Sequence, residues 1–200
     1  MNILAIMGSY RKGKTIDTLM DKAIEGAKAN NNNIQIDKLY LLDKNIGYCK
    51  NCMVCRKDDQ AKKIADCIIS DDMNTIYPMI EEADGFIFGT PVNMGAVTAI
   101  MKTFLERTCW TFAKPGKRPI PGCPTPRTAR KKRAIIIVSA GIIPPLFRRW
   151  CDDATSIIKS HCICSFNAKV LGSLYAGAVE RRGLKVYLDR AYNLGKKLTS

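Results

Sequence analysis

The sequence predicts an α/β fold built on a doubly wound parallel sheet of five strands in the order 2-1-3-4-5. Two observations predict this class. Short, almost wholly apolar runs, as in parallel strands covered on both faces, alternate with stretches whose apolar residues recur every three or four positions. Right-handed crossovers then leave few strand orders. Because the chain has 200 residues and no internal repeat, we expect residues 1–200 to form a single domain.

The first half of the chain supplies two strands and two helices. Residues Asn2–Met7 are apolar and predict the first strand, and Ile34–Tyr40 predicts the second. A helix is expected to begin at Thr15, because an apolar stripe follows at Ile16, Leu19, Met20, Ala23, Ile24 and Ala27. Asp72 is expected to cap a second helix that ends near Glu82. The cysteine-rich segment 41–70 is an insertion after the second strand.

The second half supplies three more strands. We expect them at Gly85–Gly89, Ala134–Val138 and Phe166–Leu174. A helix with Val97, Ile100, Met101, Phe104 and Leu105 on one face follows the third strand. Further helices are expected around Leu146–Ser160 and between Leu184 and Leu198. Residues 110–133 are rich in proline, glycine and cations, which predicts a long basic functional or interface loop.

Composition narrows the class of protein. Hydrophobic residues make up 46% of the chain and charged residues 25%, as in soluble globular proteins. We expect a cytoplasmic protein, because the N-terminus lacks a signal pattern and no apolar run approaches the ~20 residues of a membrane span. In that reducing compartment, nine cysteines favour metal, cluster or redox roles over disulfides.

The formal charge of +14 favours anionic ligands and acidic partner proteins. It also permits nonspecific contact with nucleic acid, but no nucleic-acid-binding module is recognisable, so that function is not favoured. The densest basic run, residues 127–133, is expected to coat a loop.

The stretch Gly8–Thr15 predicts a phosphate site. It reads Gly-Ser-Tyr-Arg-Lys-Gly-Lys-Thr between the first strand and the first helix. A turn of this kind presents free backbone N–H groups, and the helix dipole favours negative charge there. Hydroxyl and cationic side chains reinforce the site: Ser9, Arg11, Lys12, Lys14 and Thr15.

This stretch also satisfies the P-loop pattern of nucleotide phosphotransferases, with Lys14 on the phosphates and Thr15 on magnesium. Such an enzyme needs a second acidic residue for magnesium, usually at the end of a strand. The third strand ends in Gly89-Thr90-Pro91 and the fourth in Ser139-Ala140-Gly141, so neither supplies one.

The exit from the third strand suits a flat heterocycle. Residues 91–95 can present backbone groups to a ring, Gly95 permits close approach, and Met94 can lie against it. The first loop, Gly-Ser-x-Arg-x-x-x-x-Thr, and the segment from Thr90 to Arg107 resemble the FMN loops of the flavodoxin-like, NADPH-dependent FMN reductases. Val92 stands where that family often has an aromatic residue. The resemblance implies that FMN is held by Ser9, Arg11, Lys14, Thr15, Pro91, Val92, Asn93, Met94, Gly95, Ser139 and Gly141.

Four cysteines form a compact motif. Cys49, Cys52 and Cys55 are spaced C-x-x-C-x-x-C, and Cys67 follows after eleven residues. Four thiolates suit a [4Fe–4S] cluster or a zinc ion, and unmetallated thiols are the alternative. A cysteine motif just before the Asp-Asp-Met helix resembles the iron–sulfur flavoproteins, which implies a [4Fe–4S] cluster on these four residues. The last gap is longer than usual in that family, through an insertion at residues 57–63.

The remaining cysteines carry less information. Cys162 and Cys164 beside His161 are expected to pack near the fifth strand, since their spacing is atypical of zinc pairs. Cys109, Cys123 and Cys151 are isolated.

Together these features predict an FMN-dependent oxidoreductase. The resemblance implies electron transfer between a [4Fe–4S] cluster, or NAD(P)H, and FMN, with a quinone or other small molecule as acceptor. It also implies ferredoxin as a possible donor and a homodimer or homotetramer, with residues 110–133 as a candidate contact. Hydride transfer requires no acid–base side chain, so none is nominated. A P-loop NTPase or phosphotransferase and a non-enzymatic electron carrier are the alternatives.

Overall fold

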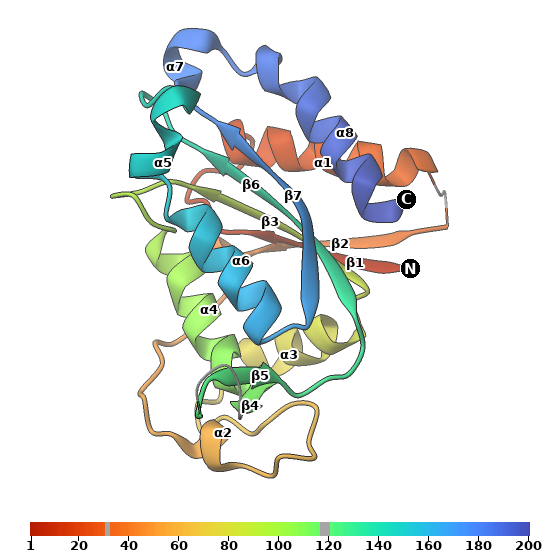
Figure 1. The fold of residues 1–200 in the computed structure, drawn as a ribbon, viewed down its shortest axis with the longest axis vertical. Coiled ribbons are helices and arrows are strands. Elements are labelled where there is room, and N and C mark those ends of the chain that lie inside the picture. Colours follow the sequence, from red (N-terminus) through yellow and green to blue (C-terminus); the bar gives the residue numbers. More distant parts are fainter. Residues whose placement is uncertain (31–32, 117–120) are drawn as a thin grey trace.

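The computed structural model describes residues 1–30, 33–116 and 121–200, and its centre is a five-stranded parallel sheet (Figure 1). The strand order is β2-β1-β3-β6-β7, which confirms the predicted order 2-1-3-4-5. All four strand pairs are parallel. The strands are β1 (Asn2–Met7), β2 (Gln35–Tyr40), β3 (Gly85–Pro91), β6 (Lys132–Ser139) and β7 (Ala168–Ala176).

Helices cover both faces of this sheet (Figure 1). One face packs against α1 (Thr15–Asn30) and α8 (Leu188–Thr199). The other packs against α3 (Met73–Glu82), α4 (Ala99–Phe112) and α6 (Ala154–Cys164). Successive strand residues alternate between the two cores, as the pleat requires, so that Ile87 faces α1 whereas Phe86 and Phe88 face the other layer.

Short elements complete the chain. A second, two-stranded antiparallel ribbon pairs β4 (Ala113–Pro115) with β5 (Pro124–Pro126). The short helices are η1 (Leu41–Asp43), α2 (Val54–Lys57), η2 (Pro145–Phe147), α5 (Arg148–Cys151), α7 (Val179–Arg182) and η3 (Lys185–Tyr187).

Helices α1 and α8 touch through two glycines. A Cβ added to Gly26 would lie 2.0 Å from the Tyr192 carbonyl oxygen, and one added to Gly195 would lie 1.8 Å from that of Ala23. Because both obstacles are backbone atoms, only glycine permits this close crossing, which fixes α1 and therefore the end of the predicted phosphate site at Gly8–Thr15.

The prediction of one long loop over 110–133 was wrong. Helix α4 continues to Phe112, β4 and β5 pair with each other, and β6 begins at Lys132. Part of that stretch, residues 117–120, lies outside the described residues. Prolines at both ends of a short ribbon hid the pairing from a search for apolar strands.

The basic run at residues 127–133 does not merely coat a loop. Arg127 is 8% exposed and Lys132 is 2% exposed. The Lys132 ammonium donates hydrogen bonds to the carbonyl oxygens of Ile80 (2.6 Å) and Glu81 (2.8 Å), near the C-terminal end of α3. These two cations are therefore parts of the interior.

Several boundaries also differ from expectation. Asp72 occupies the cap position of α3, but its side chain does not bond the helix, and the Asp71 carboxylate accepts from the Met73 N–H instead (3.0 Å). The single helix expected around Leu146–Ser160 is broken between α5 and α6, because the Asp152 carboxylate accepts from the Thr155 N–H (3.0 Å) and starts a new helix. The last expected helix is likewise divided between η3 and α8, and β7 is shifted by two residues from its expected start.

A search of the described residues finds no helix that combines the length and the hydropathy of a membrane span.

Candidate functional site

The loops that follow β1, β3 and β6 meet at one edge of the sheet. The Gly8 N–H donates to the Gly89 carbonyl (2.7 Å), which joins the first loop to β3. The Val92 N–H donates to the Ser139 carbonyl (2.8 Å), which joins the second loop to the end of β6, where the third loop begins. The carboxyl ends of parallel strands beside a reversal of strand order are where ligands bind in such sheets. The structure therefore brings together the three predicted FMN segments.

The residues of the first loop are arranged around the start of α1. Thr15 is the first residue of that helix and is half-buried, whereas Arg11 and Lys14 are exposed. Ser9 is 6% exposed, and its hydroxyl accepts a hydrogen bond from the Arg11 N–H (3.2 Å). A hydroxyl and two cations thus stand beside a helix N-terminus, which is a favourable environment for an anion.

Sequence reasoning missed Asp17, which holds this loop. Its carboxylate accepts from the Gly13 N–H (2.5 Å) and pairs with Lys38. Burial by itself raises the pKa of Asp17, but the hydrogen bonds from Lys38 and Gly13 outweigh it, and the net effect is a lowered pKa. An acidic residue in the first turn of a predicted helix, four residues after a glycine, is the sequence signal that could have found it.

Thr98, also missed, links the first loop to α4. Its hydroxyl donates to the Gly8 carbonyl (2.6 Å) and accepts from the Met101 N–H (3.3 Å), so that it caps the helix. The Tyr10 hydroxyl accepts from the Ala99 N–H (3.1 Å). A threonine before an amphipathic helix is a recognisable cap, so this signal was present in the sequence.

The second loop contains a tight turn. Asn93 and Ala96 exchange two backbone hydrogen bonds of 2.9 Å, and Met94 and Gly95 between them have φ values of 50° and 80°. The Met94 side chain is fully exposed, and Asn93 is exposed as well. The Gly95 carbonyl accepts from the Asp153 N–H (2.8 Å), which ties the turn to the start of α6.

The third loop is fixed by α7. The Glu180 N–H donates to the Gly141 carbonyl (3.2 Å), and a Cβ on Gly141 would lie 2.4 Å from Glu180 Oε1. Ser139, the last residue of β6, is 6% exposed. The hydrogen bond from Glu180 therefore holds the backbone of the third loop in place. The bond from Val92 to Ser139 keeps the start of this loop beside the second loop.

The four cysteines of the predicted cluster line one small cavity of about 30 Å³, together with Arg107 and Trp110 of α4. Cys49 and Cys52 are exposed, and Cys55 and Cys67 are half-buried. Burial raises the pKa of the Cys55 thiol to about 11, and the neighbouring thiols of Cys67, Cys49 and Cys52 contribute in the same direction. The cysteine segment lies at the end of α4 farthest from the three loops (Figure 1).

Within the three described ranges, no group of three cysteine, histidine, aspartate or glutamate side chains is arranged to hold a metal ion. Coordination would therefore draw the four sulfurs closer together than they stand. The donor set itself fits an iron–sulfur cluster by its chemistry, because four cysteines line one cavity and thiolates are the ligands that such clusters take.

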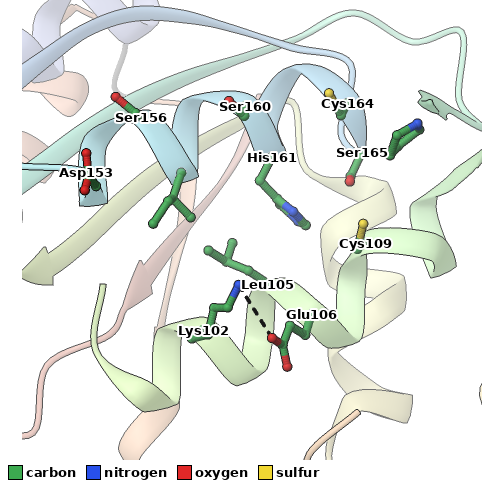
Figure 2. Close-up of a pocket in the computed structure, with 12 residues that line it drawn as sticks. Lys102, Leu105, Glu106, Cys109, Asp153, Ser156, Ser160, His161, Cys164 and Ser165 are labelled. Carbon is green, nitrogen blue, oxygen red and sulfur yellow. Dashed lines mark ion pairs between the residues drawn. The ribbon is translucent and has the colours of Figure 1, made fainter. Parts of the chain in front are cut away.

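A larger cavity, of about 670 Å³, lies between α4 and α6 (Figure 2). Lys102 and Glu106 form an ion pair along its α4 wall, and His161 projects from α6 toward α4. His161 Nε2 lies 2.9 Å from the Thr108 hydroxyl, and burial lowers the pKa of this histidine to about 3. The ring is therefore neutral. Cys162 is fully buried in the core, as expected, whereas Cys164 is half-buried and lines the cavity.

The fold and the three joined loops define a flavodoxin-like protein. Residues 1–143 match the family described as NADPH-dependent FMN reductase, and the chain belongs to this family.

Two relatives are named as iron–sulfur flavoproteins. The one from Methanosarcina thermophila is 34% identical over 108 residues, which cover 54% of this chain and 52% of that protein. One from Archaeoglobus fulgidus is 32% identical over 107 residues, or 54% of this chain and 45% of that protein. The chain thus spans about half the length of these relatives.

Solved structures share the fold at low identity. An azoreductase from Bacillus anthracis superposes with a TM-score of 0.70 at 14% identity, covering 98% of this chain and 99% of that one. An NAD(P)H:quinone oxidoreductase from Methanothermobacter marburgensis gives 0.69 at 14% identity and 98% of each chain. These likenesses concern the fold.

Proposed function

We propose that this protein is an FMN-dependent oxidoreductase that accepts electrons from NAD(P)H or ferredoxin and passes them to a quinone or another small acceptor. The observation that carries the proposal is the hydrogen-bonded meeting of the loops after β1, β3 and β6 at one sheet edge. In this proposal residues 1–200 act as a single FMN-binding domain.

The FMN phosphate would be held by the first loop. Ser9 and Thr15 offer hydroxyl donors, and Arg11 and Lys14 offer positive charge beside the N-terminus of α1. The isoalloxazine ring would rest against residues 91–95, with Ser139 and Gly141 on the adjoining loop. FMN supplies the electron chemistry when bound, and the chain binds it, orients it and limits its access to water.

The P-loop alternative has less support. A nucleotide cradle uses the backbone N–H groups of its loop for phosphate, but the Gly13 N–H is already donated to Asp17. The strand ends beside the loop offer threonine, proline and serine, which are not the carboxylate that a magnesium site needs.

The four cysteines would hold a [4Fe–4S] cluster. Cys49, Cys52, Cys55 and Cys67 line one cavity, and the names of the two relatives support the same assignment. Such a cluster supplies one-electron transfer when bound. Helix α4 begins at the FMN loops and lines the cysteine cavity with Arg107, about 12 Å further along its axis. The two sites would thus share one rigid element.

The partners follow from charge and from the family resemblance. A net charge of +14 would attract an acidic electron carrier such as ferredoxin to this protein. We also propose a homodimer or homotetramer.

The test is anaerobic purification followed by visible spectroscopy and an assay with NADH, NADPH or reduced ferredoxin and a quinone. We expect a yellow protein with flavin bands, FMN as the extracted cofactor and quinone-dependent turnover. Iron and acid-labile sulfide in equal amounts would support the cluster. A colourless protein that hydrolyses ATP with magnesium would contradict the proposal, and bound FMN without turnover would favour an electron carrier.

A further inference from the structure

Two buried arginines hold different parts of the cysteine segment, residues 41–70. Arg107 of α4 has a side chain that is 1% exposed, and Arg127, just after β5, is 8% exposed as a residue. Burying a guanidinium group costs free energy unless its N–H groups donate hydrogen bonds. The groups that accept these bonds are therefore held in place by each arginine. Most of these partners belong to the segment that carries the cysteines.

Arg107 joins the two ends of the cysteine segment. It donates to the Gly47 carbonyl (2.8 Å) before the first cysteine, and to the Ile69 carbonyl (3.4 Å) after the last. It also forms a two-pronged ion pair with Asp71, at 2.5 and 3.1 Å. Asp71 in turn accepts from the Gly47 N–H (2.8 Å), so this pair closes the segment at its base.

Arg107 also contacts a predicted ligand directly. Its Nη2 lies 3.6 Å from the Cys67 sulfur and donates to it. Its Nε, fully buried, has no hydrogen-bond partner among the described residues, although the side chain lines the cysteine cavity. A cluster bound by four thiolates carries net negative charge, so a fixed cation with a spare donor suits this wall of the cavity.

Arg127 holds the middle of the segment. Its guanidinium donates to the carbonyl oxygens of Cys55 (2.9 Å), Asp59 (2.7 Å) and Lys62 (3.4 Å). Its Nε donates to the Ala113 carbonyl of β4 (3.0 Å). These acceptors include the insertion at residues 57–63, which lengthens the gap between the last two cysteines. Arg127 therefore folds the insertion back, so that Cys55 and Cys67 line the same cavity.

We propose that Arg107 and Arg127 are positioning residues for the iron–sulfur site, and that Arg107 additionally raises its reduction potential through the hydrogen bond to Cys67. This inference rests on the proposed function, because it assumes that the four cysteines hold the cluster. Hydrogen bonds to cluster sulfurs and nearby positive charge are known determinants of potential, and outer partners of metal ligands commonly change metal retention. Arg127 contacts only carbonyl groups, so it is expected to affect retention and not potential.

The test uses the full chain, reconstituted anaerobically with ferrous iron, sulfide and FMN. The variants are Arg107→Gln, Arg107→Lys and Arg127→Gln, and the matched control is Arg190→Gln, which removes the same charge from an exposed position on α8. Iron transfer to a chelator and the midpoint potential of the cluster are measured, and circular dichroism and FMN binding report the fold.

We expect Arg107→Gln to lose iron at least about tenfold faster than the control and to have a more negative potential. Arg107→Lys keeps the positive charge but loses the planar guanidinium group that binds several acceptors at once. It is expected to lose iron faster than the control, with a smaller change in midpoint potential than Arg107→Gln. Arg127→Gln is expected to lose iron faster at unchanged potential. If Arg107→Gln does not fold, the iron loss and potentials of Arg107→Lys and Arg127→Gln still test the inference.

Iron retention and potentials equal to those of Arg190→Gln in all folded variants would overturn the inference and leave the proposed function intact. A wild-type protein that takes up no iron and sulfide would instead remove the cluster from the proposed function, and the inference with it.

Discussion

The Thr98 hydroxyl donates a hydrogen bond of 2.6 Å to the carbonyl oxygen of Gly8, and so joins the N-terminus of α4 to the first loop. Both residues are held at the sheet edge where the three predicted FMN segments meet, since the Gly8 N–H also donates to the Gly89 carbonyl of β3. This contact makes the shape of the phosphate loop depend on a helix whose far end lines the cysteine cavity.

Replacing this threonine tests that dependence. Thr98→Ala removes the helix cap and leaves the buried Gly8 carbonyl with only its longer contact to Thr90. We expect a loss of about 1–2 kcal/mol in the free energy of unfolding, measured with urea, and weaker FMN binding. Thr98→Ser, which keeps the hydroxyl, is expected to retain most of both. Equal stability of the alanine variant and the wild type would contradict this role.

Asp17, whose carboxylate binds the first loop at Gly13, makes the stability of the fold depend on pH. Its folded pKa lies below the ordinary value of 3.8, so its contribution to stability is fully present above that value and is lost as the pH falls through the folded pKa. Asp17→Asn is expected to lose about 1–3 kcal/mol at pH 7, because a charged acceptor of the Gly13 N–H is removed.

Unfolding by urea at pH 7 and near pH 3 measures this difference for Asp17. The difference in the free energy of unfolding between wild type and Asp17→Asn is expected to become smaller at acid pH. A gap that stays constant or widens at acid pH would show that the carboxylate does not stabilise the loop through its charge.

Lys132 gives the stability of the fold a second pH dependence, in the alkaline range and in the same direction as that of Asp17. Burial lowers its pKa to about 8 from the ordinary 10.5, so between these values the unfolded chain binds a proton that the folded chain does not. The stability of the wild type relative to Lys132→Met is therefore expected to rise across this interval, by up to about 3 kcal/mol. Thermal or urea unfolding at pH 7.5 and pH 10 gives the two values. A relative stability that falls with pH would refute the assignment.

Cys52→Ala tests the cysteine site separately from the flavin site. We expect the broad iron–sulfur absorbance to disappear and the FMN content to remain, because the thiol lines the cysteine cavity and lies outside the loops proposed to hold FMN. Cys151→Ala, on α5, is the matched control and is expected to keep both. Full iron content in Cys52→Ala would count against this motif as the cluster site.

The sheet was predictable from the sequence because its signals are local. The apolar run of β1 and the stripe of α1 reproduce the observed boundaries, and the switch point followed from the strand order. The β4–β5 ribbon was not predictable in this way, since three-residue strands that contain proline carry no periodicity.

The buried cations were missed for a different reason. Arg107 lies between Phe104 and Thr108 on the packed side of α4, and a charged residue at such a position is buried only if distant partners satisfy it. Its partner Asp71 is 36 residues away. Long-range pairing of this kind leaves only an indirect trace in one sequence, namely a cation within an apolar stripe.

The proposed function requires that the loop after β1 holds the phosphate of FMN. The most direct measurement compares the dissociation constants of FMN and riboflavin for the flavin-free protein by fluorescence quenching. Wild type is expected to bind FMN at least about 100-fold more tightly, since charge-assisted hydrogen bonds to a phosphate contribute roughly 3 kcal/mol in total. Arg11→Gln is expected to reduce that ratio. Equal affinity for the two flavins, or displacement of FMN by magnesium–ATP, would contradict the account.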